Sequence, residues 1–163
     1  MPHGNGCWKW KDGAKYVGQM KEGKRHGFGI LFYGEDGSIE YEGIWENDLL
    51  NGKAKRFARN GVLRYEGEFV NGLKHGNGKS FSKEGRLAYD GEYLQGKKHG
   101  TGRLYDSEER LIYSGDFVRG LFHGRGRLGE EEEEKDFRNG GIMINANLDE
   151  SFGALMNLSD IEE

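Results

Sequence analysis

Hydrophobic and polar residues alternate along most of this chain, and Gly-containing pairs interrupt the alternation at regular intervals. Across residues 63–69, large apolar side chains or glycine occupy every second position, and mostly charged residues occupy the positions between them. A period of two is typical of β-strands that bury one face. Asn71-Gly72 follows soon after, and Gly supplies the positive φ that a tight reversal needs. The pattern therefore predicts strands joined by tight turns.

This hairpin pattern repeats along the chain. When the chain is aligned on Tyr-x-Gly, successive tyrosines are separated by 25, 24, 24 and 24 positions. The aligned tyrosines are Tyr16, Tyr41, Tyr65, Tyr89 and Tyr113. Further turns are expected between the units, at Asp36-Gly37, Asn60-Gly61 and Glu84-Gly85. The spacing leaves no room for helices, so we expect an all-β fold, a single-layer antiparallel meander of consecutive β-hairpins.

The repeat array is expected to cover residues 1–140. It consists of a half repeat at 3–15, followed by full repeats at 16–40, 41–64, 65–88, 89–112 and 113–136. In the second full repeat, Asn51 and Ala54 replace the His and the Gly of the pattern. The fifth full repeat lacks its second-strand aromatic residue and runs into the acidic stretch 130–134. We expect the sheet to be weakest at these two places.

The repeated unit has a specific motif, which reads "YEGEFVNGLKHGNG" from Tyr65 and "YDGEYLQGKKHGTG" from Tyr89. This motif closely resembles the MORN repeat (membrane occupation and recognition nexus). The resemblance implies an elongated, twisted, single-layer β-sheet that acts mainly as a non-catalytic scaffold. It also implies roles in tethering proteins to membranes or to cytoskeletal structures, and a link to phospholipid binding in some members of the family.

The composition indicates an ordered but thin core. Of 163 residues, 29 are Gly, 34% are hydrophobic and 32% are charged, which leans toward disorder, whereas the 12% aromatic content favours a packed structure. Cys7 is the single cysteine and cannot form an internal disulfide. No apolar run approaches the length that spans a bilayer. We therefore expect a cytoplasmic protein that can associate with a membrane or with the cytoskeleton.

Charge is unevenly distributed, because the net charge of −4 divides into +5 over residues 1–129 and −9 over residues 130–163. Residues 141–163 form an acidic tail, predicted to be a short capping helix or an irregular segment. Its apolar residues recur at helical spacing, at Leu148, Phe152, Leu155 and Met156. Three roles stay open for this tail: a cap on the last hairpins, a motif that docks on another protein, or a mask on the basic body.

All five histidines stand directly before Gly-x-Gly, which raises the question of a metal site. Equivalent positions in successive hairpins are about 10 Å apart, whereas metal–nitrogen bonds are about 2 Å long. Neighbouring histidines therefore cannot share an ion, and a structural role at the turn is favoured. Gly-x-Gly is not a phosphate loop, because a strand and not a helix N-terminus follows it. We expect no metal, no cofactor and no catalytic residues, since no rung of the repeat differs as an active site must.

The inner face of the sheet carries the candidate partner-binding residues. A single sheet has no second layer to cover its apolar face, and exposed apolar strips usually mark interfaces. Strong twist would let the rings bury one another in part. The candidate groove residues are Tyr41, Trp45, Tyr65, Phe69, Tyr89, Tyr93, Tyr113 and Phe117. We predict a non-catalytic protein-interaction scaffold that docks a segment of a partner protein on this concave aromatic face.

The outer face is predicted to place each basic second strand between two acidic first strands. Opposite charges on neighbouring strands contribute roughly 0.2–1 kcal/mol per pair and disfavour register slips. The alternative function is a peripheral membrane module that binds anionic phospholipids through Lys55, Lys79, Arg103 and Arg127. Interleaved acids cancel the positive field at a distance, so nucleic acid is not an expected partner. An outward aromatic column is also expected, at Phe32, Phe57, Phe81 and Tyr105.

Two further arrangements stay open. The chain can be a regulatory repeat region of a larger protein, since MORN-like arrays also occur beside catalytic domains. The open edge of the half repeat can pair with a second copy of the chain, which would give a homodimer.

Overall fold

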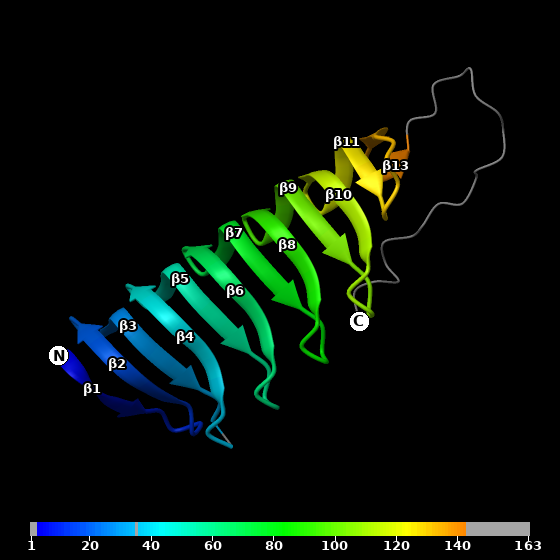
Figure 1. The fold of residues 1–163 in the computed structure, drawn as a ribbon. Helices are drawn as coiled ribbons and strands as arrows, with labels where there is room; N and C mark the ends of the chain where they lie inside the picture. Colours follow the sequence, from blue (N-terminus) through cyan, green and yellow to red (C-terminus); the bar gives the residue numbers. More distant parts are fainter. Residues whose placement is uncertain (1–2, 35, 143–163) are drawn as a thin grey trace.

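The computed structural model describes residues 3–34 and 36–142, which form one 13-stranded antiparallel sheet (Figure 1). The order of the strands across the sheet is their order along the chain, so the predicted meander of hairpins is confirmed. The strands are β1 (Gly4–Lys9), β2 (Lys15–Lys21), β3 (Lys24–Phe32), β4 (Ile39–Glu46), β5 (Leu49–Phe57), β6 (Leu63–Val70), β7 (Leu73–Phe81), β8 (Leu87–Leu94), β9 (Lys97–Tyr105), β10 (Leu111–Val118), β11 (Leu121–Leu128), β12 (Lys135–Arg138) and β13 (Gly141–Ile142). The helix predicted in the tail lies outside the described residues.

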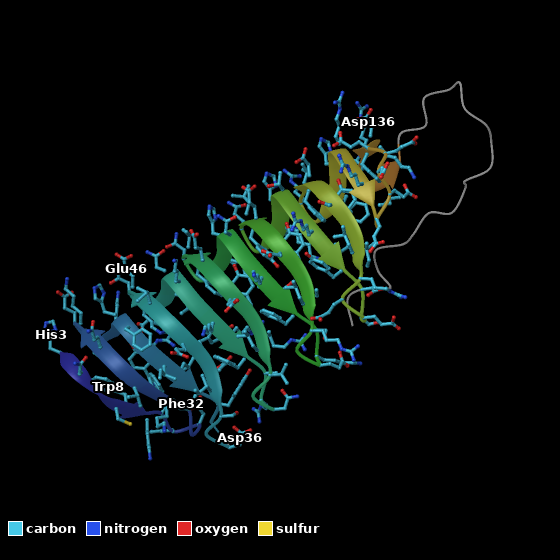
Figure 2. The ribbon with its side chains drawn as sticks, in the orientation of Figure 1. His3, Trp8, Phe32, Asp36, Glu46 and Asp136 are labelled. Atoms are coloured by element: carbon cyan, nitrogen blue, oxygen red, sulfur yellow. The ribbon has the colours of Figure 1, made fainter. Side chains whose placement is uncertain are left out.

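Tight turns join the two strands of each repeat, as the Gly-containing pairs predicted. Asn71 and Gly72 have φ angles of 50° and 79°, and Gln95 and Gly96 have φ angles of 51° and 83°. Positive φ at both central residues is the geometry of a type I′ turn, whose twist matches that of the paired strands. The turns between repeats lie along the opposite long edge of the sheet, as the positions of Glu46 and Asp36 show in Figure 2.

A row of glycines crosses the sheet near the middle of the strands. Gly67 lies opposite Gly78, which lies opposite Gly91, and the row runs from Gly6 in β1 to Gly126 in β11 with Ala54 as its one non-glycine member. Within each full repeat the strand register shifts next to this row. Such β-bulges bend a strand and increase its twist. The strands consequently curve, so that the sheet is a trough rather than a flat layer (Figure 1).

One face of the sheet, which we call the aromatic face, packs tyrosine rings onto the glycine row. Tyr65 is fully buried, and its hydroxyl donates a hydrogen bond to the Glu68 carbonyl oxygen at 3.1 Å. A Cβ added at Gly78 would lie only 2.3 Å from the Tyr65 Oη, so the ring needs a glycine beneath it. Glycine at this position therefore leaves the space that the ring of the neighbouring strand fills. The same arrangement recurs at Tyr16, Tyr89 and Tyr113.

The rings form a continuous ladder along the aromatic face, and this ladder is the core of the protein. Between Tyr65 and Tyr113, neighbouring rings lie 5.1–5.3 Å apart at interplanar angles of 82–90°. Edge-to-face contact is favourable because the positive ring edge meets the negative ring face. At the C-terminal end, Phe122 stacks on Tyr113 at 3.9 Å and Phe137 packs against both rings.

The second full repeat departs from this arrangement at Ala54, the residue that replaces Gly in the row. Ala54 is buried opposite Gly43, in the place where other repeats have a second glycine. Tyr41, the tyrosine of this repeat, is only half-buried, whereas the other four aligned tyrosines are fully buried. The methyl group of Ala54 occupies the space into which the ring of Tyr41 would fold. One substitution therefore explains why one tyrosine of the ladder is only half-buried.

Candidate functional site

Seven of the eight aromatic residues predicted to anchor a partner belong to the core of the sheet. Their relative exposures lie between 0 and 5%, and they are Trp45, Tyr65, Phe69, Tyr89, Tyr93, Tyr113 and Phe117. Tyr41 is the half-buried exception. The eight residues share one face, as the period of two predicted, but they pack against one another and against the glycine row. A partner on this face can therefore touch Tyr41 and little more than the edges of the other rings.

Cations lie over these rings and form the accessible layer of the aromatic face. The Nζ atom of Lys74 lies 4.6 Å from the ring centroid of Tyr65 and 5.3 Å from that of Tyr93. The Nζ atom of Lys98 lies 5.5 Å from the ring centroid of Tyr89. At such distances a ring face attracts an ammonium group. Both lysines stand directly before the His of their repeat, so this position carried a signal that the sequence analysis missed.

A groove of about 810 Å³ crosses the aromatic face over the middle repeats. We call it the basic groove, because its lining includes Arg56, Arg64, Lys74, Lys83, Lys97, Lys98 and Arg119. None of the described residues that line it is Asp or Glu. The lining also includes Tyr65, Tyr93 and Leu104, which are buried and supply apolar surface. Charges of one sign gathered around a low-dielectric surface reinforce one another and attract anions.

Phe81 and Tyr105 line the basic groove, although strict alternation predicted that they point outward. The prediction is wrong for these two residues because the strands are not regular around them. The register between β7 and β8 shifts between Ser80 and Phe81, and the register between β9 and β10 shifts beside Tyr105. A bulge changes the face on which the following side chains lie. The groove thereby gains aromatic surface that a period of two does not reveal.

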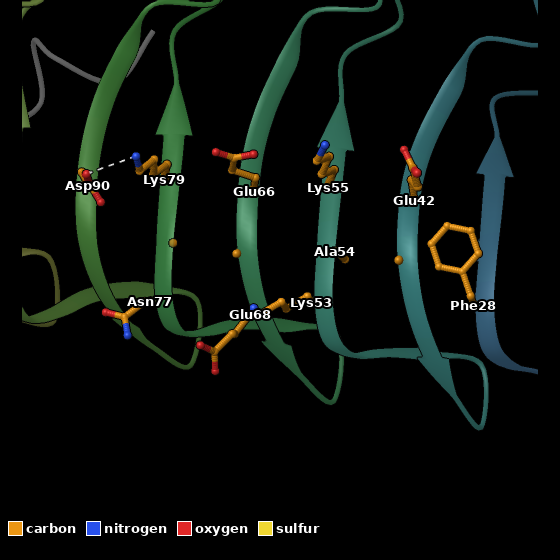
Figure 3. A pocket seen from close by; sticks show the side chains of 13 residues that line it. Phe28, Glu42, Lys53, Ala54, Lys55, Glu66, Glu68, Asn77, Lys79 and Asp90 are labelled. Atoms are coloured by element: carbon orange, nitrogen blue, oxygen red, sulfur yellow. Dashed lines mark ion pairs between the residues drawn. The ribbon is translucent and has the colours of Figure 1, made fainter.

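The opposite face, which we call the charged face, carries acids and bases in alternation. Figure 3 shows Glu42, Lys55, Glu66, Lys79 and Asp90 in a row across consecutive strands, and the strand register places each opposite the next. The Nζ atom of Lys79 lies 3.5 Å from the Asp90 carboxylate. The predicted alternation of charge is confirmed here. Each of the two lysines lies between two carboxylates, which cancel its field at a distance.

The row on the charged face changes toward its C-terminal end. Arg103 lies opposite Asp90 on one side and opposite Ser114 on the other, and Ser114 lies opposite Arg127. Ser114 therefore stands where earlier strands have an acid. Arg127 makes an ion pair with Glu134 at 3.3 Å. Four residues were predicted to bind phospholipid. Ser114 lies between the two arginines of this set, Arg103 and Arg127, whereas Glu66 lies between the two lysines, Lys55 and Lys79.

The shifted pKa values on the sheet have structural causes. Burial raises the pKa of Tyr16 and of Tyr113 to about 12, and burial also raises the pKa of Tyr65 and Tyr89. Hydrogen bonds from Thr101 lower the pKa of the Glu92 carboxyl. Within residues 3–34 and 36–142, no group of three or more His, Cys, Asp or Glu side chains is placed to hold a metal ion. In the same ranges, no helix has the length and apolar character needed to cross a bilayer.

These features define a linear array of β-hairpin repeats, whose core is a ladder of rings on glycine. The family model described as MORN repeat matches six stretches of the chain, at residues 1–15, 16–37, 41–62, 65–85, 89–107 and 113–128. The chain therefore belongs to the MORN-repeat family, as the repeated motif predicted. MORN repeats are non-enzymatic modules associated with the binding of proteins or membrane lipids, and they are found in membrane-associated proteins.

Proposed function

We propose that this protein is a non-catalytic scaffold that docks a segment of a partner protein in the basic groove. The proposal is carried by the contrast between the two faces. Acids and bases alternate along the row from Glu42 to Asp90 on the charged face, whereas the described lining of the basic groove has seven cations and no carboxylate. Like charges held close together repel, so a surface of one sign is better explained by an anionic partner than by folding.

The groove favours a segment that has both carboxylates and apolar side chains. Charge-assisted hydrogen bonds from Lys and Arg to carboxylates are roughly twice as strong as neutral ones. The buried rings of Tyr65 and Tyr93 and the exposed parts of Phe81 and Tyr105 offer apolar surface between the cations. The docking face is the one predicted from the sequence, but the cations replace most of the predicted aromatic anchors as the groups that a partner contacts.

Charge reversal in the groove is expected to weaken partner binding strongly. The double variant Lys83→Glu, Lys97→Glu replaces two exposed cations of the groove lining. We expect partner binding to fall at least about tenfold, because each reversal removes an attraction and adds a repulsion of about 1 kcal/mol. Affinity capture from native lysate with quantitative mass spectrometry identifies the partner, and titration of that purified partner gives the change in Kd.

The matched control is the double variant Lys53→Glu, Lys55→Glu. It changes the same residue type, the same degree of exposure and the same net charge, but on the charged face. We expect the control to bind the partner as the wild type does. Loss of the partner in the control, with retention in the groove variant, would move the docking site to the charged face.

Binding of anionic phospholipid is a second candidate function, favoured by the position of Ser114 between Arg103 and Arg127. A serine in place of an acid leaves this end of the charged face more positive than the row that contains Lys55 and Lys79. Sedimentation of the wild type and of the groove variant with phosphatidylserine vesicles at low salt distinguishes the two functions. Vesicle binding that survives the groove variant would favour the charged face as a lipid site, and no binding of the wild type would remove the candidate.

A further inference from the structure

We propose that the acidic C-terminal segment of this chain, residues 143–163, docks in the basic groove of the same molecule. The inference rests on the proposed function, because it uses the same groove. It names a segment of the chain itself as the ligand that occupies this groove before a partner binds. A partner protein would then have to displace the segment, so that its apparent affinity is set by a competition within the chain.

The charges of the segment and the groove are complementary. Residues 143–163 contain five Asp or Glu and no Lys or Arg, and the described groove lining contains seven Lys or Arg and no Asp or Glu. The acidic stretch 130–134 is a poorer candidate, because Glu134 and Glu131 are already paired with Arg127 and Lys135 at the end of the sheet. The longer segment beyond β13 is therefore the acidic part of the chain that fits the groove.

The segment is long enough to reach the whole groove from its starting point when extended, and the central part of the groove when helical. It follows Ile142 at the end of β13, and the nearest groove residues lie in the turn between β10 and β11. Strands are spaced by about 4.8 Å, so the groove extends from about 10 Å to about 40 Å from β13. The 21 residues of the segment span about 70 Å when extended and about 30 Å as a helix. Either conformation brings its carboxylates to the central lysines.

The apolar residues of the segment match the apolar part of the groove. Leu148, Phe152 and Leu155 are separated by four and three positions, which places them on one side of a helix. The groove presents ring edges between its cations, so carboxylates can meet the lysines while apolar side chains lie on the rings. A tether this short raises the local concentration of the segment to the order of millimolar, so even a weak interaction fills the groove.

Carbodiimide cross-linking of the intact protein tests the proposal. The reagent joins a carboxylate to a lysine amine with loss of water and adds no spacer, so it reports direct ion pairs. We expect Asp149, Glu150 or Asp160 to be joined to groove lysines at least about tenfold more often than to lysines of the charged face. The groove lysines are Lys74, Lys83, Lys97 and Lys98, and the matched lysines of the charged face are Lys53, Lys55 and Lys79.

Mixing equal amounts of ¹⁴N- and ¹⁵N-labelled protein before cross-linking distinguishes one chain from two. Cross-linked peptide pairs of a single isotope show docking within one molecule, as proposed, whereas mixed pairs show docking on a second copy and overturn the proposal. Equal cross-linking of the segment to both sets of lysines, or none to the groove, also overturns it.

A binding measurement separates failure of this inference from failure of the proposed function. The probe is a labelled synthetic peptide of residues 143–163, and the receptor is the full chain in which Asp149, Glu150 and Asp160 are changed to Asn or Gln. We expect this variant to bind the probe at least about tenfold more tightly than the wild type, because its own segment no longer fills the groove. Equal binding by both chains would refute self-docking. Loss of that binding in the Lys83→Glu, Lys97→Glu variant would still support the groove as a docking site.

Discussion

The variant Tyr89→Ala is expected to lose about 3–5 kcal/mol of stability, the usual cost of deleting a buried ring. Tyr89 is fully buried, its ring lies within 5.2 Å of the rings of Tyr93 and Phe117, and its hydroxyl is bonded to the Glu92 carbonyl oxygen. Removing it opens a gap in the middle of the ladder, where no second layer of structure can collapse into the space. In a linear array the loss falls on the adjacent repeats first.

Two signals recorded during urea unfolding check this prediction. Circular dichroism reports all the strands, whereas tryptophan fluorescence reports only the N-terminal end, because Trp8, Trp10 and Trp45 are the three tryptophans. We expect the dichroism of Tyr89→Ala to decline at lower urea concentration than its fluorescence. The control Tyr89→Phe keeps the ring and loses one hydrogen bond, at a cost of about 1 kcal/mol. A loss below 1 kcal/mol in Tyr89→Ala would contradict the assignment of this ring to the core.

The variant Gly102→Ala is expected to lose about 2–3 kcal/mol, as overpacked cores do. The added Cβ would lie 2.3 Å from the Tyr89 Oη and 2.6 Å from its Cζ. Rings on both sides prevent Tyr89 from moving along the face, so it must swing outward. Ala54 shows the result in the second full repeat, where Tyr41 is only half-buried although the other aligned tyrosines are fully buried. Chemical denaturation gives the change in stability, and tyrosine nitration followed by mass spectrometry detects the exposed ring.

Gly96→Ala provides a control for the effect of losing a glycine. Gly96 has a φ of +83° in its turn, but an added Cβ would meet nothing within 4 Å. Its substitution tests backbone strain alone and should cost about 1–2 kcal/mol, because alanine is strained at a positive φ. If Gly102→Ala costs no more than Gly96→Ala, the close contact between ring and glycine is not what the repeat requires.

The sequence predicted the fold well because its signals are local. A period of two selects strands, Gly pairs select tight turns, and a spacing of 24 or 25 residues repeats the unit, so the meander follows without any long-range information. The same signals placed Tyr65, Gly67 and Phe69 on one face correctly. They also predicted the alternation of acids and bases on the charged face.

The degree of burial could not be read from the same pattern. A hydrophobic period of two predicts the face of the sheet on which a ring lies. It does not predict that the strands curve until Tyr65 and Tyr89 lose all contact with solvent. The bulges that shift the register also moved Phe81 into the groove, contrary to strict alternation. The role of Lys74 and Lys98 was not predicted because the residue at this position of the repeat varies. Leu50 and Phe122 stand at the equivalent positions of other repeats. The basic groove is thus a product of curvature and of residues outside the consensus.

These assignments change how binding experiments should be designed. A double variant such as Trp45→Ala, Tyr89→Ala removes two core rings, so loss of a partner from it would report unfolding of the sheet. Exposed cations of the basic groove can be exchanged without touching the ladder. Separating the residues that hold the sheet together from those that a partner can reach is therefore the practical consequence of the structure.

Alkaline titration of the tyrosines, resolved by residue with ¹³C-labelled tyrosine and NMR, tests the central claim most directly. A buried tyrosine has a higher pKa when folded than when unfolded, so its contribution to stability is complete below about pH 10 and is lost as the pH rises through the raised value. Tyr16, Tyr65, Tyr89 and Tyr113 should stay protonated until the sheet unfolds, near or above pH 12. Ionisation of these four near pH 10 in a sheet that remains folded would show that the rings face solvent and that the ladder is not the core.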